Sequence, residues 1–425
     1  MERSFCYDVA VIGGGTAGTC AAIQAGRLGA RVVLIEASAR LGGTIVNSGI
    51  ARPGMFHAWG KQICGGIGWE LVTKALDEAR MPMPDWPNPD LQWWKLQIPM
   101  DPMLYSALCD EAVLDAGVEL RLHAMPGAME RDPEDGWTLA VCGRDGLETL
   151  SARRVVDCSG DAIASRLAGA TIRSSPDCQP ATLSFDLSGY DDAKLDRDRL
   201  DAAFVQAVEA GELRAEDACW QIDKPQVRQL LYKHGRNANH IPATPDCATA
   251  RGRTALEVEA RASVRRIVRW LRTQPGLEKL SLDNVFPEVG VRESVTVEGL
   301  ETVTREDYCS GRVFPDAVCY SFYPIDAHGL RSTDWETENL KPGVVATVPR
   351  GATIARGVPD LLVAGRILSS DHLANSALRT QPTCMATGQA AGALAVLSVR
   401  QGVPAESVPM DDLRATLLEH GAILP

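Results

Sequence analysis

The fold of this chain is decided by its first strand and glycine turn, Asp8-Val9-Ala10-Val11-Ile12-Gly13-Gly14-Gly15-Thr16-Ala17-Gly18. The apolar run predicts a buried strand, and the small and apolar side chains at residues 21–28 predict a helix after the turn. Gly13 permits a tight turn, Gly15 leaves room for a pyrophosphate beside the backbone, and Gly18 allows helix and strand to pack closely. The helix N-terminus offers N–H groups to that pyrophosphate. This unit therefore predicts a dinucleotide-binding fold.

A second apolar strand at residues 31–35 ends at Glu36, whose carboxylate can accept hydrogen bonds from both hydroxyls of a ribose. A short loop then leads to Arg40-Leu41-Gly42-Gly43-Thr44, which resembles the second glycine signature of FAD-containing proteins of the glutathione reductase and fumarate reductase type. Gly-Gly pairs also form ordinary surface turns. The position directly after the ribose acid favours the flavin interpretation.

Length and composition describe an ordinary globular protein with room for two or three domains. The 425 residues are 45% hydrophobic and 23% charged, and the net charge is −12 at pH 7. This acidic balance argues against nucleic acid or an anionic membrane as the main partner. We expect no signal peptide, because Glu2 and Asp8 interrupt the N-terminus, and no membrane span, because the most apolar stretch, residues 386–399, is too short.

The 12 cysteines are scattered and include no C-x-x-C pair. This spacing fits neither a disulfide framework nor a zinc site, so we expect free thiols, several of them buried as small hydrophobic side chains. A reducing, cytoplasmic location fits best. The redox-active disulfide of the glutathione reductase branch is also absent, since that branch places a Cys pair near the N-terminus.

The chain is expected to divide into a nucleotide-binding domain and an insertion. Residues 1–184 form its first part, with a Pro- and Trp-rich excursion at residues 60–100, and residues 346–425 complete it. Residues 185–345 form a cap or substrate domain. The tryptophans of the excursion fit two interpretations equally well, the lining of a substrate cavity and the anchoring of a loop. The predicted fold is α/β, a Rossmann-like FAD-binding domain of the glutathione reductase type with an inserted α+β cap.

Periodicity places further elements within these parts. We expect helices at residues 103–116 and 251–272, and strands at residues 118–122, 137–142, 147–150, 154–158 and 183–187. The strand before Ser159-Gly160-Asp161 returns to the nucleotide sheet, and Asp161 serves either at the cofactor or as the N-cap of the next helix. Near the C-terminus, residues 360–366 read as a buried strand ending in Gly365. A small-residue helix at residues 382–392 then points its N-terminus, near Gly388, at a flavin carbonyl.

Four blocks together resemble the FAD-dependent oxidoreductase family, which is distantly similar to fumarate reductase and succinate dehydrogenase flavoproteins. The blocks are residues 8–44, residues 155–170, Gly290-Val291-Arg292-Glu293-Ser294 with Tyr323-Pro324-Ile325-Asp326-Ala327-His328, and residues 361–392. The resemblance covers nearly the whole chain and implies bound FAD. The residues expected at this cofactor are Gly13, Gly15, Thr16, Ala17, Gly18, Glu36, Ala37, Arg40, Gly43, Thr44, Asn47, Ser159, Gly160, Asp161, Gly365, Arg366, Thr383, Gly388, Gln389 and Ala390.

Flavin redox chemistry needs a proton acceptor near the reacting carbon and charge stabilisation around the ring. His372 is the leading base candidate, because it follows the Gly365 strand on the loop that leads to the flavin-facing helix; a buried structural histidine is the alternative. Arg379 and Arg292 are expected to hold a carboxylate or to polarise a carbonyl, or else to form structural ion pairs.

Asp326 and His328 lie two residues apart in an extended segment and therefore share a face. This spacing suits a base with its orienting carboxylate, or a metal site. Because no third ligand is in view, we expect no metal. Tyr323 is a weaker candidate.

The leading functional expectation is an FAD-dependent dehydrogenase or oxidase that transfers a hydride between the flavin and a small polar organic substrate. One alternative is a flavin-dependent isomerase or lyase without net redox turnover. Another is a flavin-bearing subunit of a larger electron-transfer or RNA-modifying complex. A homo-oligomer is compatible with the sequence, and the substrate, the electron acceptor and the direction of reaction stay open.

Overall fold

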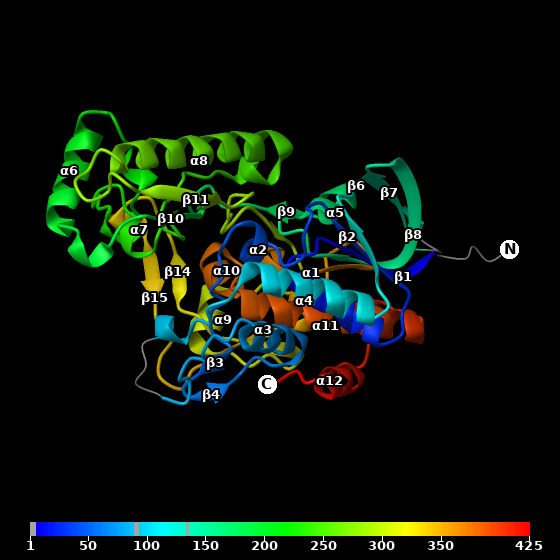
Figure 1. The fold of residues 1–425 in the computed structure, drawn as a ribbon. Coiled ribbons are helices and arrows are strands. Elements are labelled where there is room, and N and C mark those ends of the chain that lie inside the picture. Colours follow the sequence, from blue (N-terminus) through cyan, green and yellow to red (C-terminus); the bar gives the residue numbers. More distant parts are fainter. Residues whose placement is uncertain (1–5, 89–92, 133–135) are drawn as a thin grey trace.

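The computed structural model describes residues 6–88, 93–132 and 136–425. Within these residues a seven-stranded sheet forms the centre of the molecule, with the order β5-β2-β1-β8-β7-β6 and with β17 also paired to β8 (Figure 1). Its strands are β1 Tyr7–Ile12, β2 Val32–Glu36, β5 Glu119–Leu122, β6 Met125–Asp132, β7 Gly136–Gly143, β8 Gly146–Asp157 and β17 Leu361–Val363.

The sheet is parallel on one side and antiparallel on the other. Strand β1 runs parallel to β2 and β8, and β2 runs parallel to β5. Strand β8 pairs with the antiparallel β7 as far as Ala152 and then with the parallel β17 from Val155 onward. The carboxyl ends of β1, β2, β8 and β17 therefore meet at one edge, where open α/β sheets bind their ligands. The predicted α/β, Rossmann-like fold is confirmed.

Two details of the strand prediction are corrected. Residues 147–150 and 154–158 do not form separate strands, because Ser151, Ala152 and Arg153 contain no turn residue and continue the ladder as part of β8. Strand β6 was not expected, although it pairs with β7 over Met125 to Asp132. Its alternation of polar and apolar residues is weak, and only the neighbouring strand defines it.

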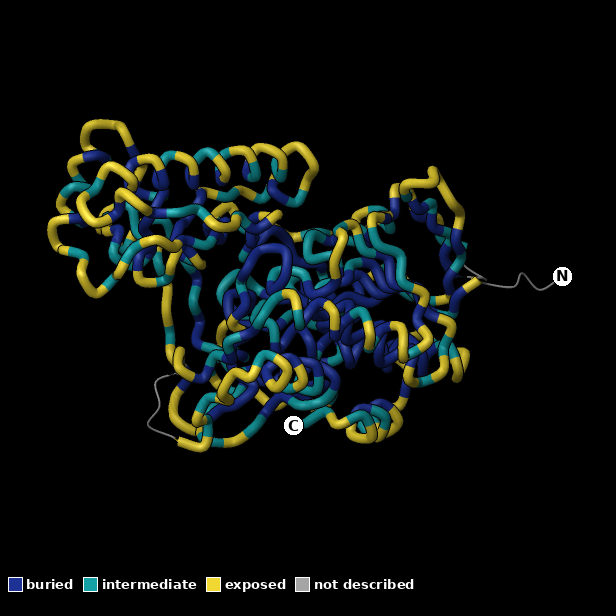
Figure 2. Tube along the Cα trace, viewed as in Figure 1, coloured by how far each residue is buried: buried dark blue, intermediate teal, exposed yellow. Residues whose placement is uncertain are grey.

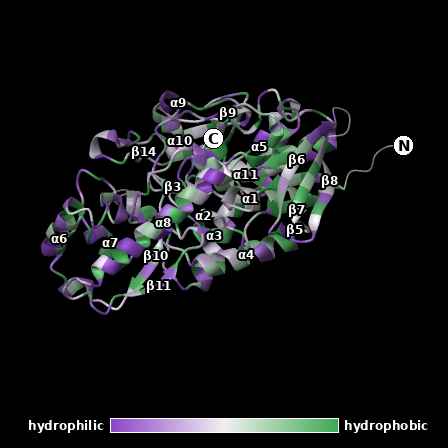
Figure 3. Ribbon diagram, turned by 90° about the horizontal axis from the view of Figure 1, so that it is seen from above, coloured by the Kyte–Doolittle hydropathy of each residue, from purple (hydrophilic) through white to green (hydrophobic). Residues whose placement is uncertain are grey.

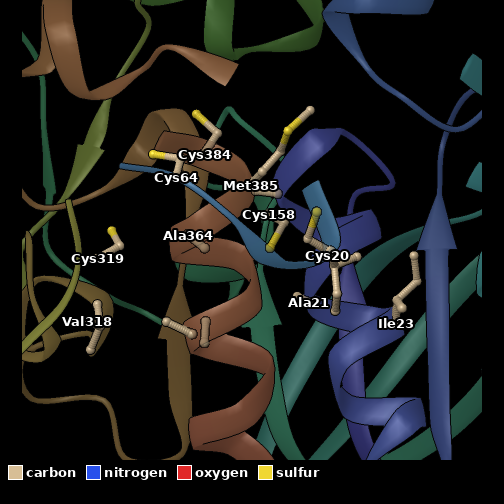
Figure 4. Close-up of a cluster of buried hydrophobic side chains, with 14 of the residues drawn as sticks. Cys20, Ala21, Ile23, Cys64, Cys158, Val318, Cys319, Ala364, Cys384 and Met385 are labelled. Atoms are coloured by element: carbon tan, nitrogen blue, oxygen red, sulfur yellow. The ribbon is translucent and has the colours of Figure 1, made fainter. Parts of the chain in front are cut away.

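Helix α1 (Thr16–Arg27) packs directly against helix α11 (Gln381–Gln401) beneath the sheet. A Cβ atom at Gly388 would lie 2.1 Å from the Ala17 carbonyl oxygen, and one at Gly392 would lie 2.3 Å from that of Ala21. The glycines thus bring the two backbones together. Figure 4 shows the buried side chains at this contact, including Cys20 and Cys384. All the cysteines of the described residues are free thiols, as expected.

A second hydrophobic core lies in residues 181–291, apart from the core around the sheet. It is built by β10 Phe185–Ser188, α6 Arg197–Glu209, α7 Arg228–Tyr232, α8 Ala250–Leu271 and β11 Ser281–Val285. Helix α8 matches the helix expected at residues 251–272. This part projects from the body of the molecule, and each of the two parts has its own dark-blue interior (Figures 1 and 2).

Buried residues between 303 and 354 belong to the core around α1 and α11 rather than to the second core. Their elements are α9 Arg305–Ser310, β13 Ala317–Ser321, β14 Ile325–Ala327, β15 Glu336–Glu338 and β16 Ala346–Pro349. Figure 3 shows hydrophobic residues on strand β7, and hydrophilic residues on helices such as α6 and α7 as well as in loops. In the described part of the chain, no helix combines the length and apolarity that crossing a bilayer requires.

The remaining helices and strands include α2 Thr44–Asn47, β3 His57–Ala58, β4 Lys61–Gln62, α3 Gly66–Glu78, α4 Pro102–Asp115, α5 Ile163–Leu167, β9 Ile172–Arg173, β12 Thr296–Val297, α10 His372–Leu378 and α12 Met410–Glu419. Of these, α3 and α4 contribute buried residues to the core around α1 and α11. In the excursion at residues 60–100, Trp86 stacks on His57 with ring centroids 4.2 Å apart, whereas Trp94 lines the large cavity described below. Part of this excursion, residues 89–92, lies outside the described residues.

Candidate functional site

A cavity of about 1770 Å³ lies at the carboxyl ends of the parallel strands, between the sheet and the second unit. Cavities that hold a single small molecule usually measure about 300–1,000 Å³. This cavity therefore has room for a dinucleotide and a second molecule. Residues from both parts of the protein line it, including Gly15 and Gly365 from the nucleotide fold and Lys233 and Arg253 from the projecting unit.

The nucleotide end of the cavity is formed by the first turn of α1 and by Glu36. Gly15, Thr16 and Ala17 line it, and the first-turn N–H groups of a helix have no carbonyl partner within the helix. The Glu36 carboxylate accepts hydrogen bonds from the backbone N–H of Gly14 at 2.5 Å and of Ser38 at 2.7 Å. These bonds fix the acid at the end of β2, facing the cavity.

The glycines of the turn have the geometry that a phosphate cradle needs. Gly13 has φ +97°, and a Cβ there would lie 2.7 Å from the Cys158 carbonyl oxygen. A Cβ on Gly18 would lie 1.7 Å from the Gly13 oxygen, so only glycine fits. At Gly15 the nearest atom to an added Cβ is 3.9 Å away, on Gly43. The open space beside Gly15 is the cavity itself, and a pyrophosphate fits there.

Asp161 joins three segments at the wall of the cavity. Its carboxylate accepts hydrogen bonds from Arg366 at 3.0 Å, from the Ser294 hydroxyl at 2.8 Å and from Arg253 of helix α8 at 2.6 Å. Its alternative role as an N-cap is not found, because the N–H of Ile163 donates to the Ser159 hydroxyl instead. Asp161 thus ties the projecting unit to the nucleotide fold.

Most residues expected at the cofactor line the cavity. They are Gly13, Gly15, Thr16, Ala17, Glu36, Ala37, Gly43, Thr44, Asn47, Ser159, Gly160, Asp161, Gly365 and Arg366. Others are not among its lining residues, namely Gly18, Arg40, Thr383, Gly388, Gln389 and Ala390. Gly18 has the packing role described above. Arg40 is exposed, and its backbone N–H approaches the Ser38 hydroxyl.

The expectation that helix α11 meets the cavity near Gly388 is corrected. The helix begins at Gln381, so Gly388 lies about two turns inside it and faces Ala17. The Gln389 amide donates to the Gln24 side chain at 3.0 Å and accepts from the Ile67 N–H at 3.1 Å, which makes it a buried structural link. Thr380, Gln381 and Cys384 are the lining residues at this helix end.

Asp326 and His328 lie together in the lining of the cavity, as their spacing predicted. We call this part of the cavity its inner end; it is lined by Trp220, Lys233, Arg292, Asp326, His328, Trp335 and Arg379. The His328 Nε2 atom is 3.0 Å from one Asp326 oxygen, and Trp335 donates its indole N–H to the other at 2.9 Å. The His328 side chain is 10% exposed and that of Asp326 is 14% exposed. Tyr323, the weaker candidate, also lines the cavity.

The two side chains have opposite charge preferences. Burial opposes ionisation of Asp326, but hydrogen bonds from His328 and Trp335 outweigh it and lower its pKa to about 2. Burial, followed by the positive charge of Arg292, lowers the pKa of His328 to about 4, although Asp326 acts in the other direction. At neutral pH the pair is therefore a carboxylate beside a neutral imidazole. Its Nε2–H donates to Asp326, and Nδ1 keeps its lone pair.

Arg292 and Arg379 reach the same end of the cavity, and neither has a carboxylate partner within ion-pair distance among the described residues. Arg292 donates to the Pro180 carbonyl at 2.6 Å and to Asn237 at 3.0 Å. Arg379 donates to Gln179 at 2.9 Å. Burial, followed by mutual repulsion, lowers the pKa of Arg292 to about 9. The expected alternative of structural ion pairs is thus not found for either arginine.

His372 is not a lining residue of the cavity, contrary to its expected place beside the flavin. The segment taken for a loop is helix α10, and His372 begins it while Arg379 follows its end. Seven helical residues span about 10 Å, so only the far end of α10 reaches the cavity. His372 Nδ1 lies 2.8 Å from the Glu293 carboxylate, and this hydrogen bond outweighs burial and raises the pKa of His372.

Sequence reasoning missed several residues at the inner end. Lys233 lines the cavity with its Nζ 3.9 Å from the ring centroid of Trp220, and burial, then Arg292, lowers its pKa to about 8. His240 packs against His328 with ring centroids 5.0 Å apart. These residues come from the projecting unit, where no motif marks them. Only the fold brings them to the Asp326–His328 pair.

The nucleotide end and the inner end together have room and side chains for a flavin dinucleotide with a substrate beside it. Three comparisons with known proteins show limited similarity. A 43-residue segment is 58% identical to glutathione reductase of Schizosaccharomyces pombe, which is 10% of this chain and 9% of that enzyme. Solved structures include p-nitrophenol 4-monooxygenase of Pseudomonas putida DLL-E4, at 14% identity and TM-score 0.46, covering 98% of this chain and 84% of that one. A geranylgeranyl bacteriochlorophyll reductase-like protein of Thermoplasma acidophilum matches at 12% identity and TM-score 0.43, covering 97% and 82%.

The match to a family model is far more extensive. The model described as FAD dependent oxidoreductase matches residues 8–417, which include the glycine turn, Glu36, the Asp161 network and the inner end of the cavity. The expected cofactor, FAD, and the expected enzyme class, an oxidoreductase, are thereby confirmed. The chain belongs to the FAD-dependent oxidoreductase family.

Proposed function

We propose that this enzyme transfers a hydride between FAD and a small polar organic molecule, as a dehydrogenase or oxidase, and that His328 carries the accompanying proton. The observation behind this proposal is the Asp326–His328 pair in the same cavity as the nucleotide-binding residues. A neutral imidazole with a free lone pair, oriented by a carboxylate, can accept a proton as a general base.

The residues of the nucleotide end would hold FAD along the cavity. Glu36 would bind the adenosine ribose, the first turn of α1 would bind the pyrophosphate, and Gly365 with Thr380 would lie beside the ring system. FAD, when bound, supplies the hydride acceptor or donor. The protein supplies the substrate position and the proton acceptor, both at the inner end.

His328 would take a proton from the substrate at Nδ1. Its Nε2–H is committed to Asp326, so Nδ1 is the atom with a lone pair at neutral pH. Asp326 would hold the imidazole in this tautomer and stabilise the imidazolium that forms. Trp335, which donates to the other oxygen of Asp326, fixes the carboxylate in turn.

We further propose that residues 185–345 act as the substrate cap that the sequence suggested. Lys233, Arg292 and His328 from this range line the inner end, and the unit of residues 181–291 has its own hydrophobic core. Arg253 of α8 binds Asp161 and so holds the cap against the nucleotide fold. A cap in this position excludes water from the reaction site.

An anaerobic screen of small organic substrates against the oxidised holoenzyme tests the function. A redox enzyme leaves reduced flavin and a bleached absorbance band, whereas an isomerase or lyase converts substrate with the flavin still oxidised. Flavin reduction by at least one small polar compound is the expected result. Product formation with no change of the flavin spectrum at any time would contradict the proposal.

A further inference from the structure

The inner end of the cavity contains a group of buried polar atoms that have no hydrogen-bond partner among the described residues. They are Trp220 Nε1, His240 Nε2, His328 Nδ1 and Arg379 Nε. Trp220, His328 and Arg379 line the cavity, and the Trp220 ring stacks on that of His240 with centroids 5.9 Å apart. Buried polar atoms are normally paired, so such a group needs a ligand or water to complete it.

The partners of the two histidines determine what these atoms can bind. His240 Nδ1 lies 2.7 Å from the Trp220 carbonyl oxygen, so this nitrogen carries the hydrogen and Nε2 is an acceptor. His328 Nδ1 is likewise an acceptor, because its Nε2–H faces Asp326. His328 lines the cavity whereas His240 is not among its lining residues, so His328 Nδ1 is the acceptor within reach of a ligand's donor such as a hydroxyl group.

The positive charges at the inner end favour a ligand that also carries an anionic group. Arg292 and Arg379 form no ion pair in the described part of the chain. Besides burial, the positive charge of Arg292 also contributes to the lowered pKa of Lys233. Asp326 is already engaged by His328 and Trp335. Guanidinium groups that have no ion-pair partner bind a planar oxyanion well, since they offer paired N–H donors.

We propose that the substrate is a hydroxycarboxylate, an organic anion whose carboxylate binds Arg292 and Arg379 and whose hydroxyl donates to His328 Nδ1. This substrate class rests on the proposed function. In its oxidation the carbon bearing the hydroxyl loses a hydride, for which FAD is the acceptor. The hydroxyl proton passes to His328 Nδ1, and the C–O single bond becomes a carbonyl. The reverse reaction consumes the same hydride and proton.

Binding can be measured without turnover. Isothermal titration calorimetry is carried out on the anaerobic holoenzyme after photochemical reduction of its flavin, with malate, succinate, malamide and sulfate as probes. Malate carries both groups, succinate lacks the hydroxyl, and malamide lacks the charges. The assay needs no turnover, so it tests the substrate class separately from the proposed function. Failure of the proposed function would instead appear as an absence of flavin reduction by any compound.

The expected order is malate tighter than succinate, and both tighter than malamide. The carboxylate is expected to contribute about tenfold to a hundredfold in affinity, as charge-assisted hydrogen bonds do, and the hydroxyl about threefold to tenfold. Equal affinity for malate and malamide would overturn the carboxylate assignment. Equal affinity for malate and sulfate would also overturn the proposal and leave a site for any oxyanion.

Variants assign the contacts. R379Q and R292Q should weaken malate and succinate binding at least tenfold, and H328N should remove the advantage of malate over succinate while leaving succinate binding in place. R173Q is the matched control, because Arg173 pairs with Glu298 outside the cavity lining and its loss changes the net charge equally. Arg292 also donates a hydrogen bond to Pro180, so R292Q could fail to fold. R379K, which keeps the positive charge, then tests whether charge alone is enough to bind the carboxylate. Unchanged binding in folded R379Q would contradict the proposal.

Discussion

Two histidines show what side-chain chemistry the sequence could and could not locate. His328 was recognisable because Asp326 stands two residues before it, and the structure brings the two within 3.0 Å. His372 looked equally suitable in sequence, but it pairs with Glu293 outside the lining of the cavity. The difference depends on which way helix α10 turns its first residue, and no local pattern encodes that direction.

The pH dependence of flavin reduction separates the two histidines. The pKa of His328 is lowered to about 4, whereas that of His372 is raised above its ordinary value. A base must be deprotonated, so with His328 the value of kcat/KM should stay level as pH falls from 8 to about 5. Stopped-flow reduction across this range measures it. A decline that begins above pH 6.5 would favour His372 as the base.

Glu36 provides a test at the nucleotide end. E36Q should weaken FAD binding about tenfold or more, because the neutral amide loses charge-assisted hydrogen bonds to the ribose. The dissociation constant follows from the fluorescence of released FAD. E209Q, at the exposed end of α6, is the matched control and should retain FAD like the parent. Equal retention by E36Q would show that the acid has no part in FAD binding.

Among the helices and strands, the sequence predicted most of those that local residue patterns specify. The first strand, glycine turn and helix agree with β1 and α1, and residues 251–272 agree with α8. The errors concern elements whose structure depends on contacts with other parts of the chain. Strand β8 is one strand rather than two, β6 depends on its pairing with β7, and α10 was taken for a loop. Gly388 was assigned to the flavin because small residues suit both a helix contact and a cofactor contact.

The close packing of α1 against α11 predicts that a larger residue at Gly388 lowers the stability of the protein. G388A would place a Cβ 2.1 Å from the Ala17 carbonyl, so the helices must separate. Overpacking of this kind typically costs about 1–3 kcal/mol of the free energy of unfolding. Urea denaturation of the holoenzyme measures the loss. G143A is the control, because nothing lies within 4 Å of its added Cβ, and a loss no larger than that of G143A would contradict the packing account.

In the whole molecule, the nucleotide-binding part and the projecting unit both contribute lining residues to one cavity, and the sequence alone could not predict this arrangement. The nucleotide residues were predictable because a phosphate and a ribose impose a fixed motif. Lys233, Trp220 and His240 were not, because they come from a unit whose own core consists of ordinary helices. They become neighbours of His328 only when the projecting unit packs against the rest of the chain.

The inner end should also affect the stability of the protein toward acid. Burial lowers the pKa of His328 and His240 in the folded protein, so the unfolded chain binds more protons below about pH 6.5. Stability should therefore fall as pH drops from 6.5 toward 4, by at most about 1.4 kcal/mol per pH unit for each proton. Thermal midpoints of H328N and the parent test this, and the midpoint of H328N should fall less.

His372 should behave in the opposite sense. Its pKa is raised in the folded protein, so its pairing with Glu293 stabilises the fold below about pH 6.5, and this contribution is lost at higher pH. The deficit of H372N relative to the parent should therefore be larger at pH 6 than at pH 9. A deficit that does not change with pH would show that the charge of His372 has no part in the pair.

We propose His328, and not His372, as the base of the FAD-dependent reaction in this cavity. The most direct test is anaerobic stopped-flow reduction of the bound flavin in H328N and H372N, with a substrate found in the screen. H328N should keep its FAD and its oxidised spectrum but reduce about 10²–10⁴-fold more slowly, whereas H372N should reduce within a few-fold of the parent. The claim is contradicted if H328N reduces at the parental rate, or if H372N shows the large loss instead.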